Sequence, residues 1–462
     1  MTVTELKKLL TPGRRVHLVG IGGVSMFPLA QVLRGAGLMV TGSDFNPDSP
    51  NVQTLRAQGV KVFIGHHAEN VNDAELVIRT AAVHDDNPEI AAAREQNIPV
   101  FERSQAWGAI SMDYRHALCI AGTHGKTSTT SMATHIVLAA GQDPTVMIGA
   151  NLPLLGCGYR VGKGDTIILE SCEYCNSFLS FRPTTAVILD IEADHLDFFK
   201  DLADIERSFR SFASLVPDTG MVIASADDRN TMDTLESLDR PLMTFGLGNY
   251  ADVYCEDLTW DHGLPSFDLM NAGKKLCRVE LSVPGLYNVK NALAAATAAL
   301  SMGINTAAIA RGLKEYTGAE RRFEYKGSCN GARIYDDYAH HPSEIQSLLD
   351  MATTLGYERV ICAFQPHTYS RTKALFPDFV TALSKADKTI LADVYAARET
   401  DTLGISSRDL AERIPGAEYC PGLEDVERRL RELAQPGDLI LTVGAGNLNQ
   451  VAARLAEENA PA

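Results

Sequence analysis

Short runs of apolar residues alternate with longer amphipathic segments along the chain. Residues 15–19 form an apolar run followed by a glycine-rich turn, and residues 26–36 then repeat apolar positions with helical spacing until Gly37. Runs at 116–120 and 166–170 have the length and apolar character of buried strands. Strands that alternate with helices predict parallel sheets with helices on both faces. We therefore expect an α/β protein.

The same pattern continues to the end of the chain, with one exception. Residues 220–283 contain many turn residues between short apolar stretches, so we expect this region to be rich in strands. An alanine-rich segment over 288–300 is expected to form a helix. Further strands are expected at 38–41 (ending near Asp44), 186–191, 332–335, 360–364, 389–393 and 439–443, and a further helix at 128–140.

The length of the chain predicts several domains. A chain of 462 residues is too long for one hydrophobic core and suits about three domains of roughly 150 residues each. The pattern changes around 104–114 and again at Arg321-Arg322. We therefore expect three domains, at 1–108, 109–320 and 321–462.

Composition narrows the class of protein. Hydrophobic residues make up 45% and charged residues 22%, as in ordinary globular proteins, and apolar runs stay below the ~18 residues that a membrane span needs. The net charge of −16 argues against nucleic acid as a partner. The nine cysteines are scattered, and the first residues lack the pattern of a secretion signal. We expect a cytoplasmic protein without membrane insertion, whose oligomeric state the sequence leaves open.

The segment AGTHGKTSTT at 121–130 lies between an expected strand and an expected helix. In this setting free backbone N–H groups and the helix dipole favour a phosphate group. Lys126 is expected to reach the terminal phosphates, and the hydroxyl of Thr127 to meet Mg²⁺. Ile120 occupies the place of the first glycine of the common phosphate-loop pattern, so the motif is a shorter form, GTxGKT.

The turn after the first expected strand, GIGGVSM at 20–26, resembles a dinucleotide-binding fingerprint, with Asp44 about 20 residues later. Ser25 takes the place of its last glycine, and a tight structural turn is the alternative interpretation. Together with the GKT motif, Ser25 disfavours a dehydrogenase.

Glu170, Cys172, Glu173 and Cys175 follow the strand expected at 166–170. Carboxylates at the end of a strand near a phosphate loop are typical Mg²⁺ ligands, although a surface loop with a helix-starting glutamate is an alternative. Metal binding and redox chemistry are possible roles for the CxxC pair. We favour the interpretation that the two cysteines are small buried residues.

Three further polar segments follow expected strands. Asp194, His195 and Asp197 suit an edge that binds metal and phosphate. In the last block, DDYAHHP at 336–342 and FQPHTYSR at 364–371 stand where doubly wound sheets bind ligands. Polar loops that cap helices are the alternative for each of these two segments.

Taken together and in this order, the motifs resemble the Mur ligase family of peptidoglycan synthesis, and within it the ligases that add L-alanine. The resemblance covers essentially the whole chain. It rests on GxGGxxM at 20–26, AGTHGKT at 121–127, the Glu170/Glu173 segment, IExDHLD at 191–197, VPGxxNxxN at 283–291, RRFExKG at 321–327, DDYAHHP at 336–342 and FQPHTYSRT at 364–372.

The resemblance implies a Rossmann-like N-terminal domain that binds a UDP-sugar, a central P-loop-type ATPase domain and a Rossmann-like C-terminal domain. It implies an amide ligase in which ATP phosphorylates the lactyl carboxylate of UDP-N-acetylmuramate. The amine of L-alanine then attacks the acyl phosphate, and phosphate leaves. The implied cofactors are ATP and Mg²⁺, and the implied partners are these small molecules.

The resemblance also assigns roles to individual residues. The matching catalytic positions are Lys126, His195, His341 and Arg371. The matching nucleotide positions are Gly122, Thr123, His124, Gly125, Lys126, Thr127, Ser128, Asn288, Asn291, Arg322 and Asp337; the metal positions are Thr127, Glu173 and His195; the substrate positions are Gly22, Gly23, Asp44, His341 and Arg371.

Several positions depart from the family pattern. Cys172 and Cys175 replace two aspartates, Asp190 an asparagine, Tyr287 a histidine and Ser25 a glycine. Two alternatives stay open: a muropeptide-recycling ligase that attaches a tripeptide, and a nucleotide-binding protein that has lost ligase activity. The sequence does not fix the effect of the two cysteines, the choice among alanine, glycine and serine, or the closure of the domains.

Overall fold

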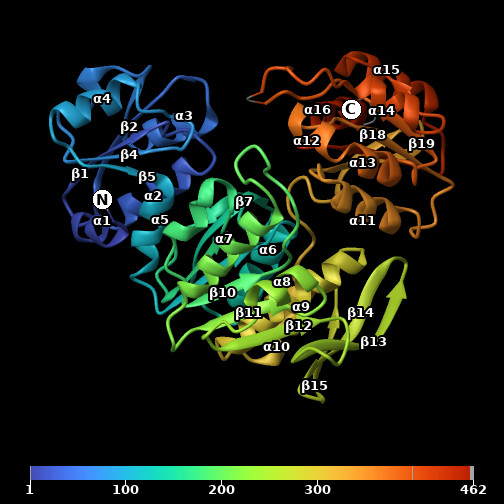
Figure 1. The fold of residues 1–462 in the computed structure, drawn as a ribbon, viewed down its shortest axis with the longest axis horizontal. Helices are drawn as coiled ribbons and strands as arrows, with labels where there is room; N and C mark the ends of the chain where they lie inside the picture. Colours follow the sequence, from blue (N-terminus) through green and yellow to red (C-terminus); the bar gives the residue numbers. More distant parts are fainter. Residues whose placement is uncertain (1, 398, 458–462) are drawn as a thin grey trace.

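The computed structural model describes residues 2–397 and 399–457, and these residues form three sheets that follow one another along the chain (Figure 1). Helices pack around each sheet, so the molecule has three α/β lobes, coloured blue, green to yellow, and orange to red. The expected α/β class is confirmed. Within the described residues, no helix combines the length and apolar character needed to cross a membrane.

The N-terminal lobe is built on a five-stranded parallel sheet of order β3-β2-β1-β4-β5. Nucleotides bind such sheets where the strand order reverses, which here is beside β1. Its elements are α1 (Val3–Leu9), β1 (Arg15–Val19), α2 (Met26–Gly35), β2 (Met39–Asp44), α3 (Pro50–Ala57), β3 (Lys61–Ile64), the 3₁₀ helix η1 (Ala68–Val71), β4 (Leu76–Arg79), α4 (Pro88–Glu95), β5 (Val100–Glu102) and α5 (Arg103–Ser111).

The central lobe holds a ten-stranded sheet of order β15-β14-β13-β12-β11-β10-β6-β9-β7-β8. Its strands β9, β6 and β10 are parallel neighbours, so the loops that follow them emerge at one edge. The first part comprises β6 (His116–Ala121), α6 (Lys126–Ala139), β7 (Thr145–Leu152), β8 (Cys157–Arg160), β9 (Thr166–Glu170), η2 (Tyr174–Ser180), β10 (Thr185–Ile188) and α7 (Leu202–Ser214). The second comprises β11 (Met221–Ser225), α8 (Arg229–Leu235), β12 (Leu242–Gly246), β13 (Val253–Asp261), β14 (Leu264–Asn271), β15 (Lys274–Glu280), α9 (Leu286–Ser301) and α10 (Thr306–Glu315).

The C-terminal lobe has a six-stranded sheet of order β16-β17-β21-β18-β19-β20, parallel except for β16. Its elements are β16 (Glu324–Cys329), β17 (Ala332–Asp337), α11 (Pro342–Ala352), β18 (Arg359–Phe364), α12 (Tyr369–Ala374), α13 (Phe376–Leu383), β19 (Lys388–Leu391), α14 (Ser407–Arg413), β20 (Glu418–Tyr419), α15 (Leu423–Leu433), β21 (Asp438–Val443) and α16 (Asn449–Glu457).

Apolar side chains cover both faces of the central sheet. One core is continuous with that of the N-terminal lobe and includes Trp107, Phe178 and Phe212. The core on the opposite face contains Met132 of α6 and Leu293 of α9. The C-terminal sheet has two further cores, one on each face. Because the faces of the sheets are buried in this way, polar loops gather at the strand ends.

The strands and helices occur where the apolar pattern predicts them, with shifts at their ends. β10 stops earlier than the predicted 186–191, because the chain leaves the sheet to bond to the phosphate loop. The N–H of Thr123 donates to the carbonyl oxygen of Asp190 (3.1 Å), and the N–H of His124 donates to its carboxylate (2.8 Å). The change in hydrophobic pattern at residues 104–114 coincides largely with helix α5, which precedes β6 of the central sheet.

Candidate active site

The phosphate loop connects β6 to α6 and depends on its glycines. Gly122 and Gly125 have φ angles of 151° and 79°, which favour glycine. A Cβ atom on Gly125 would lie 2.5 Å from Oδ1 of Asn291, so only glycine fits between the loop and α9. The loop therefore runs directly into the N-terminus of α6, where free N–H groups favour an anion.

Lys126 is folded back against the loop. Its Nζ donates to the carbonyl oxygens of Gly122 (2.5 Å) and Thr123 (3.0 Å), and to Oε2 of Glu173 (3.0 Å). Burial alone would lower the pKa of Lys126, but the charge of Glu173 outweighs it, and the pKa lies above its usual value. Burial likewise opposes ionisation of Glu173, yet Lys126 holds the pKa of this carboxyl below its usual value. Both groups are therefore charged.

The atoms predicted to bind a cation meet beside Lys126. Thr127 Oγ1 donates to Oε1 of Glu170 (3.0 Å), and Nε2 of His195 lies 3.5 Å from Oε1 of Glu173. These residues follow the neighbouring strands β9, β6 and β10. Carboxylate and hydroxyl oxygens are the ligands that Mg²⁺ prefers, so the oxygens of Thr127, Glu170 and Glu173 fit this ion.

Cys172 and Cys175 are both exposed, and our interpretation of them as small buried residues is wrong. After β9 the chain turns outward into η2, where Cys175 has a left-handed φ of 54°. Cys172 joins Glu173 and His195 in one group, in which one possible ligand atom from each lies within 4.8 Å of the others. One of the two unusual cysteines therefore stands at the predicted metal site.

Two acids of the loop after β10 have partners of their own. Asp194 Oδ1 accepts hydrogen bonds from Arg371 Nη2 (2.8 Å) and Nε (3.0 Å). Burial would raise the pKa of Asp194, but Arg371 holds it well below its usual value. Asp197 accepts a hydrogen bond from the Tyr174 hydroxyl (2.9 Å) and lies outside the group of possible metal ligands. Arg371 thus joins the C-terminal lobe to the central lobe.

Arg322 brings the C-terminal lobe to the phosphate loop. Its Nη2 donates to Oγ1 of Thr127 (3.2 Å). Asp337, at the end of β17, accepts hydrogen bonds from the N–H groups of Phe323 (2.7 Å) and Ala339 (2.8 Å), so it fixes the backbone beside Arg322. Burial raises the pKa of Asp337 to about 6. The two predicted nucleotide residues are thus positioned together.

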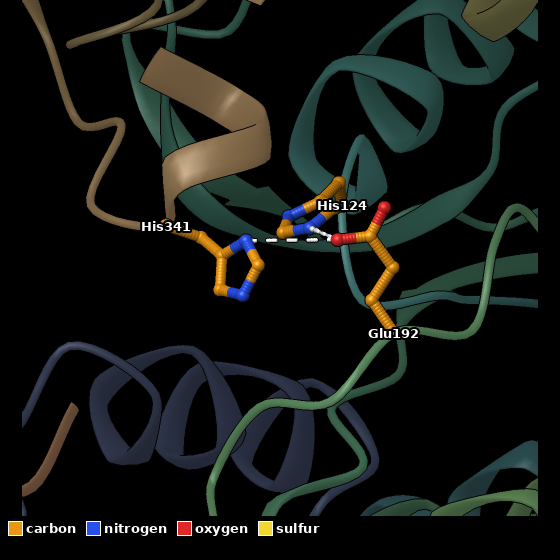
Figure 2. A group of neighbouring side chains, drawn as sticks. All are labelled: His124, Glu192 and His341. Carbon is orange, nitrogen blue, oxygen red and sulfur yellow. Dashed lines mark hydrogen bonds and ion pairs between the residues drawn. The ribbon is translucent and has the colours of Figure 1, made fainter. Parts of the chain in front are cut away.

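His124 lies between carboxylates of two lobes. Its Nε2 is 3.2 Å from Oε2 of Glu192, and its Nδ1 is 3.1 Å from Oε1 of Glu344. Burial opposes protonation of His124, but Glu344, Asp190 and Glu192 outweigh it and raise its pKa well above the usual value. His341 points toward the same Glu192 oxygen, with Nδ1 at 3.6 Å (Figure 2).

A cavity of about 770 Å³ opens beside the phosphate loop, between the central and C-terminal lobes. Asn288 and Asn291 of α9 line it together with Ser128. Asn291 Oδ1 accepts a hydrogen bond from Thr129 Oγ1 (3.2 Å), and Asn288 Nδ2 donates to the carbonyl oxygen of Pro284 (2.7 Å). The cavity is of a size that holds small ligands and cofactors.

Gly22, Gly23 and Asp44, the residues expected to bind the substrate in the N-terminal lobe, lie close together at the end of β1. The N–H of Gly22 donates to Oδ2 of Asp44 (2.8 Å). A Cβ atom on Gly22 would lie 2.9 Å from that oxygen and 2.7 Å from Cγ2 of Val52, so a larger residue there would displace these side chains. Ser25 begins α2 without a side-chain capping bond. The residues predicted for the first glycine turn therefore lie together.

Glu192 and Glu344 are residues of this region to which the sequence motifs assign no role. Glu192 lies inside the IExDHLD motif, and Glu344 completes a capping box at the start of α11. Each therefore had a local signal. Their common contact with His124 depends on how the central and C-terminal lobes pack, which no local pattern reveals.

Three family models match successive parts of the chain. The match covers residues 15–115 with the model described as "Mur ligase family, catalytic domain", residues 120–299 with "Mur ligase middle domain", and residues 321–446 with "Mur ligase, glutamate ligase domain".

Similar proteins cover nearly the whole chain. A UDP-N-acetylmuramate–L-alanine ligase of Caldanaerobacter subterraneus is 44% identical over 96% of this chain and 98% of its own length. One of Clostridium novyi is 43% identical over 95% and 96%. Among solved structures, MurC of Thermotoga maritima aligns with a TM-score of 0.79 at 28% identity, over 96% of this chain and 98% of its own. A murein peptide ligase of Psychrobacter arcticus aligns with a TM-score of 0.71 at 25% identity, over 97% and 100%.

Proposed function

The chain belongs to the Mur ligase family, and from this premise we propose that it joins L-alanine to the lactyl carboxylate of UDP-N-acetylmuramate. The reaction uses ATP, forms an amide bond and serves peptidoglycan synthesis. The full-length similarity to ligases of this name supports the choice of L-alanine.

The contact at Thr127 is the structural observation that carries this proposal. Its hydroxyl lies between Glu170 of the central lobe (3.0 Å) and Arg322 of the C-terminal lobe (3.2 Å), directly after Lys126. A phosphate loop, carboxylates and a cation of a second lobe therefore converge on one position. This arrangement suits transfer of a phosphoryl group to an acceptor held between lobes.

Amide formation from a carboxylate needs a leaving group. In the first proposed step, a lactyl carboxylate oxygen bonds to the γ-phosphorus of ATP while the bond to the β–γ bridging oxygen breaks, and ADP is released. The L-alanine nitrogen then bonds to the acyl carbon and loses a proton, and inorganic phosphate leaves with the electron pair of its C–O bond. Lys126 offsets the repulsion between the two anions of the first step.

The proposed Mg²⁺ ligands are Thr127, Glu173 and His195, and Glu170 orients the hydroxyl of Thr127. When bound, Mg²⁺ supplies positive charge that neutralises phosphate oxygens. The family resemblance implies an aspartate where this chain has Cys172, so we assign Glu173 a larger share of the negative charge at this site.

The remaining predicted residues divide among the substrates. We assign ATP to the cavity beside the phosphate loop and the uridine nucleotide to the first glycine turn. The nucleotide residues are Gly122, Thr123, His124, Gly125, Lys126, Thr127, Ser128, Asn288, Asn291, Arg322 and Asp337; the substrate residues are Gly22, Gly23, Asp44, His341 and Arg371. The proposed domains are 1–108 for the UDP-sugar, 109–320 for ATP and 321–462 for ligation, and the proposed location is the cytoplasm.

Phosphate release is the direct test. With ATP, Mg²⁺, UDP-N-acetylmuramate and L-alanine, we expect phosphate and UDP-N-acetylmuramoyl-L-alanine in equal amounts, and no product when either organic substrate is omitted. Glycine and L-serine should be tested beside L-alanine, because one small group in an apolar pocket changes transition-state binding by only about 1–3 kcal/mol. No phosphate release with the complete mixture would refute the ligase assignment.

A muropeptide ligase is the second candidate, because a murein peptide ligase shares the fold along the whole chain. The same assay separates the two candidates when a tripeptide that begins with L-alanine replaces the free amino acid. Faster turnover with the tripeptide than with L-alanine would identify the tripeptide as the amine substrate, while the proposed chemistry would stay the same.

A further inference from the structure

His124, Glu192 and His341 form a compact cluster that shares no residue with the proposed magnesium site (Figure 2). They come from the phosphate loop, the loop after β10 and the start of α11. His124 Nε2 lies 3.2 Å and His341 Nδ1 3.6 Å from the same oxygen of Glu192. One possible ligand atom from each residue lies within 4.8 Å of the others. We call these three residues the His–Glu–His cluster.

Each ring of the cluster has an oxygen within 3.3 Å of its other nitrogen, in an ion pair for His124 and a hydrogen bond for His341. His124 Nδ1 lies 3.1 Å from a carboxylate oxygen of Glu344, and His341 Nε2 lies 3.3 Å from the carbonyl oxygen of Ala193. Histidines that bind a metal nearly always donate their other N–H to a carboxylate or a backbone carbonyl. These contacts direct His124 Nε2 and His341 Nδ1 toward Glu192.

Ser343 holds the third member of the cluster in place. Its Oγ donates to Oε2 of Glu192 (2.6 Å), while its N–H makes a long hydrogen bond of 3.4 Å to Nδ1 of His341. The carboxylate is thus oriented by a neighbour. The lone pair on Nδ1 of His341 accepts this long hydrogen bond, and a metal ion can take the place of the Ser343 N–H.

We propose that the His–Glu–His cluster is a binding site for Zn²⁺, distinct from the magnesium site. Two imidazole nitrogens and one carboxylate oxygen suit zinc, whereas Mg²⁺ takes mainly oxygen ligands and a set dominated by imidazole does not suit it. A tetrahedral zinc ion with bonds of about 2.0–2.1 Å holds neighbouring ligand atoms roughly 3.3 Å apart. The two measured separations from Glu192, 3.2 and 3.6 Å, need little adjustment to reach this value.

A zinc ion in this position joins two lobes. His124 and Glu192 belong to the central lobe, and His341, which is also a proposed substrate residue, belongs to the C-terminal lobe. The ion replaces the contact of His124 Nε2 with Glu192 and removes His341 from the substrate. Zinc therefore stabilises the present arrangement of the lobes and slows the ligase, so this inference goes beyond the proposed function.

Metal binding can be measured without substrates, on the full-length protein freed of metal by a chelator. Co²⁺ serves as the spectroscopic probe for the zinc site, because four-coordinate cobalt absorbs far more strongly in the visible range than six-coordinate cobalt. We expect one equivalent of strongly absorbing Co²⁺, displaced by one equivalent of Zn²⁺. Equilibrium dialysis gives the Kd for Zn²⁺.

Matched variants locate the ion. His124→Gln, Glu192→Gln and His341→Gln should each remove the intense absorption and weaken Zn²⁺ binding at least 10-fold, and Glu344→Gln should weaken it about 10- to 100-fold by loss of the partner of His124. Glu173→Gln tests the group formed by Cys172, Glu173 and His195, and His84→Gln removes an exposed histidine of the N-terminal lobe. Both variants should retain the intense Co²⁺ absorption.

Thermal unfolding of each variant, followed by circular dichroism, shows whether it is folded before its affinity is interpreted. Glu344→Gln leaves all three ligands in place and keeps the test valid if one ligand variant does not fold. Absence of intense Co²⁺ absorption in the parent protein would overturn the proposal. So would a signal that disappears with Glu173→Gln and survives His124→Gln. Both outcomes are independent of the ligase assay, which contains no zinc.

Discussion

Histidines meet carboxylates in two regions of this molecule, and the two regions differ in what they connect. In the N-terminal lobe, buried Glu89 accepts hydrogen bonds from Ser43 (2.6 Å), Asn70 (2.6 Å) and His66 (2.9 Å), and His17 lies 3.6 Å away. All belong to one lobe, and we call them the Glu89 cluster. In the His–Glu–His cluster, the three residues come from two lobes, and His124 belongs to the phosphate loop.

The two central carboxylates have similar acidities in different surroundings. Burial opposes ionisation of Glu89, but its polar neighbours, His17 and Ser43 foremost, lower its pKa to about 2. Burial likewise opposes ionisation of Glu192, and His124 lowers its pKa to about 2. The Glu89 side chain is 0% exposed, whereas that of Glu192 is 36% exposed. The Glu89 cluster therefore serves the stability of one lobe, whereas the His–Glu–His cluster serves the contact between two lobes.

The largest expected effect is on stability. Glu89→Ala leaves Ser43, His66 and Asn70 buried without their common acceptor, and breaking a buried pair of this kind costs about 3–5 kcal/mol. Urea unfolding followed by circular dichroism measures the change in the free energy of unfolding. Glu192→Ala, at the half-exposed counterpart, should cost much less. Equal losses for the two variants would remove the distinction between the clusters.

The next effect is on turnover beside the second cluster. Lys126→Ala removes the positive charge that stabilises the transferring phosphoryl group, and loss of such a group lowers kcat about 10²-fold or more, or about 2.7 kcal/mol. Initial rates of phosphate release measure it. Lys314→Ala, which removes an exposed partner of Glu280, is the matched control and should keep normal turnover. Near-normal turnover in Lys126→Ala would place the phosphate site elsewhere.

A smaller effect is expected in the dependence of stability on pH. The pKa of Glu89 in the folded protein, about 2, lies below its ordinary value of 4.5. Ionised Glu89 therefore stabilises the fold fully above about pH 4.5, and this contribution is lost as the pH falls from about 4.5 toward about 2. Glu89→Gln, which cannot ionise, should flatten the fall in unfolding free energy over this range.

Glu192→Gln is the counterpart for the pH measurement. It should flatten the same curve less, because Glu192 is partly solvated. Guanidinium unfolding at a series of pH values measures both variants. A parent-like slope in Glu89→Gln would show that other carboxyl groups cause the acid sensitivity.

The smallest effect on the free energy of unfolding is expected for a substitution that touches neither cluster. Arg229 and Asp233 form an ion pair on the surface of α8, with side chains 91% and 65% exposed. Arg229→Ala should change the free energy of unfolding by at most about 0.5 kcal/mol, because exposed pairs contribute little. Added salt should reduce even this difference. A loss above 1 kcal/mol would mean that exposed charges also support the fold.

Local patterns predict much of the fold. The limits of β1 and β9 agree with the apolar runs at 15–19 and 166–170, because a buried parallel strand is a continuous apolar segment bounded by polar loops. β10 is shorter than its apolar run, because Asp190 bonds to the phosphate loop and draws the chain out of the sheet. Strand ends are decided by such tertiary bonds, which the pattern of apolar residues does not contain.

The residues of the candidate site likewise fall into those that local motifs predict and those that depend on tertiary packing. Lys126, Thr127, Glu173 and His195 are predicted because motifs place each at a strand end, and parallel neighbouring strands bring these ends together. Their individual roles stay predictions. The exposure of Cys172 and the shared contact of His124 with two glutamates depend on the path of η2 and on the packing of two lobes. The Glu89 cluster was not anticipated either, since its members are scattered between residues 17 and 89.

The mutual neutralisation of Lys126 and Glu173 has a thermodynamic consequence. A phosphate group that draws Lys126 away leaves Glu173 with an uncompensated charge, which attracts a divalent cation. A cation at Glu173 conversely releases Lys126 for phosphate. ATP alone leaves Glu173 without a positive partner, and Mg²⁺ alone leaves Lys126 without a negative one. When both are bound, each of the two residues has a partner of opposite charge. ATP and Mg²⁺ should therefore bind with positive heterotropic coupling, and linkage requires each to tighten the other by the same factor.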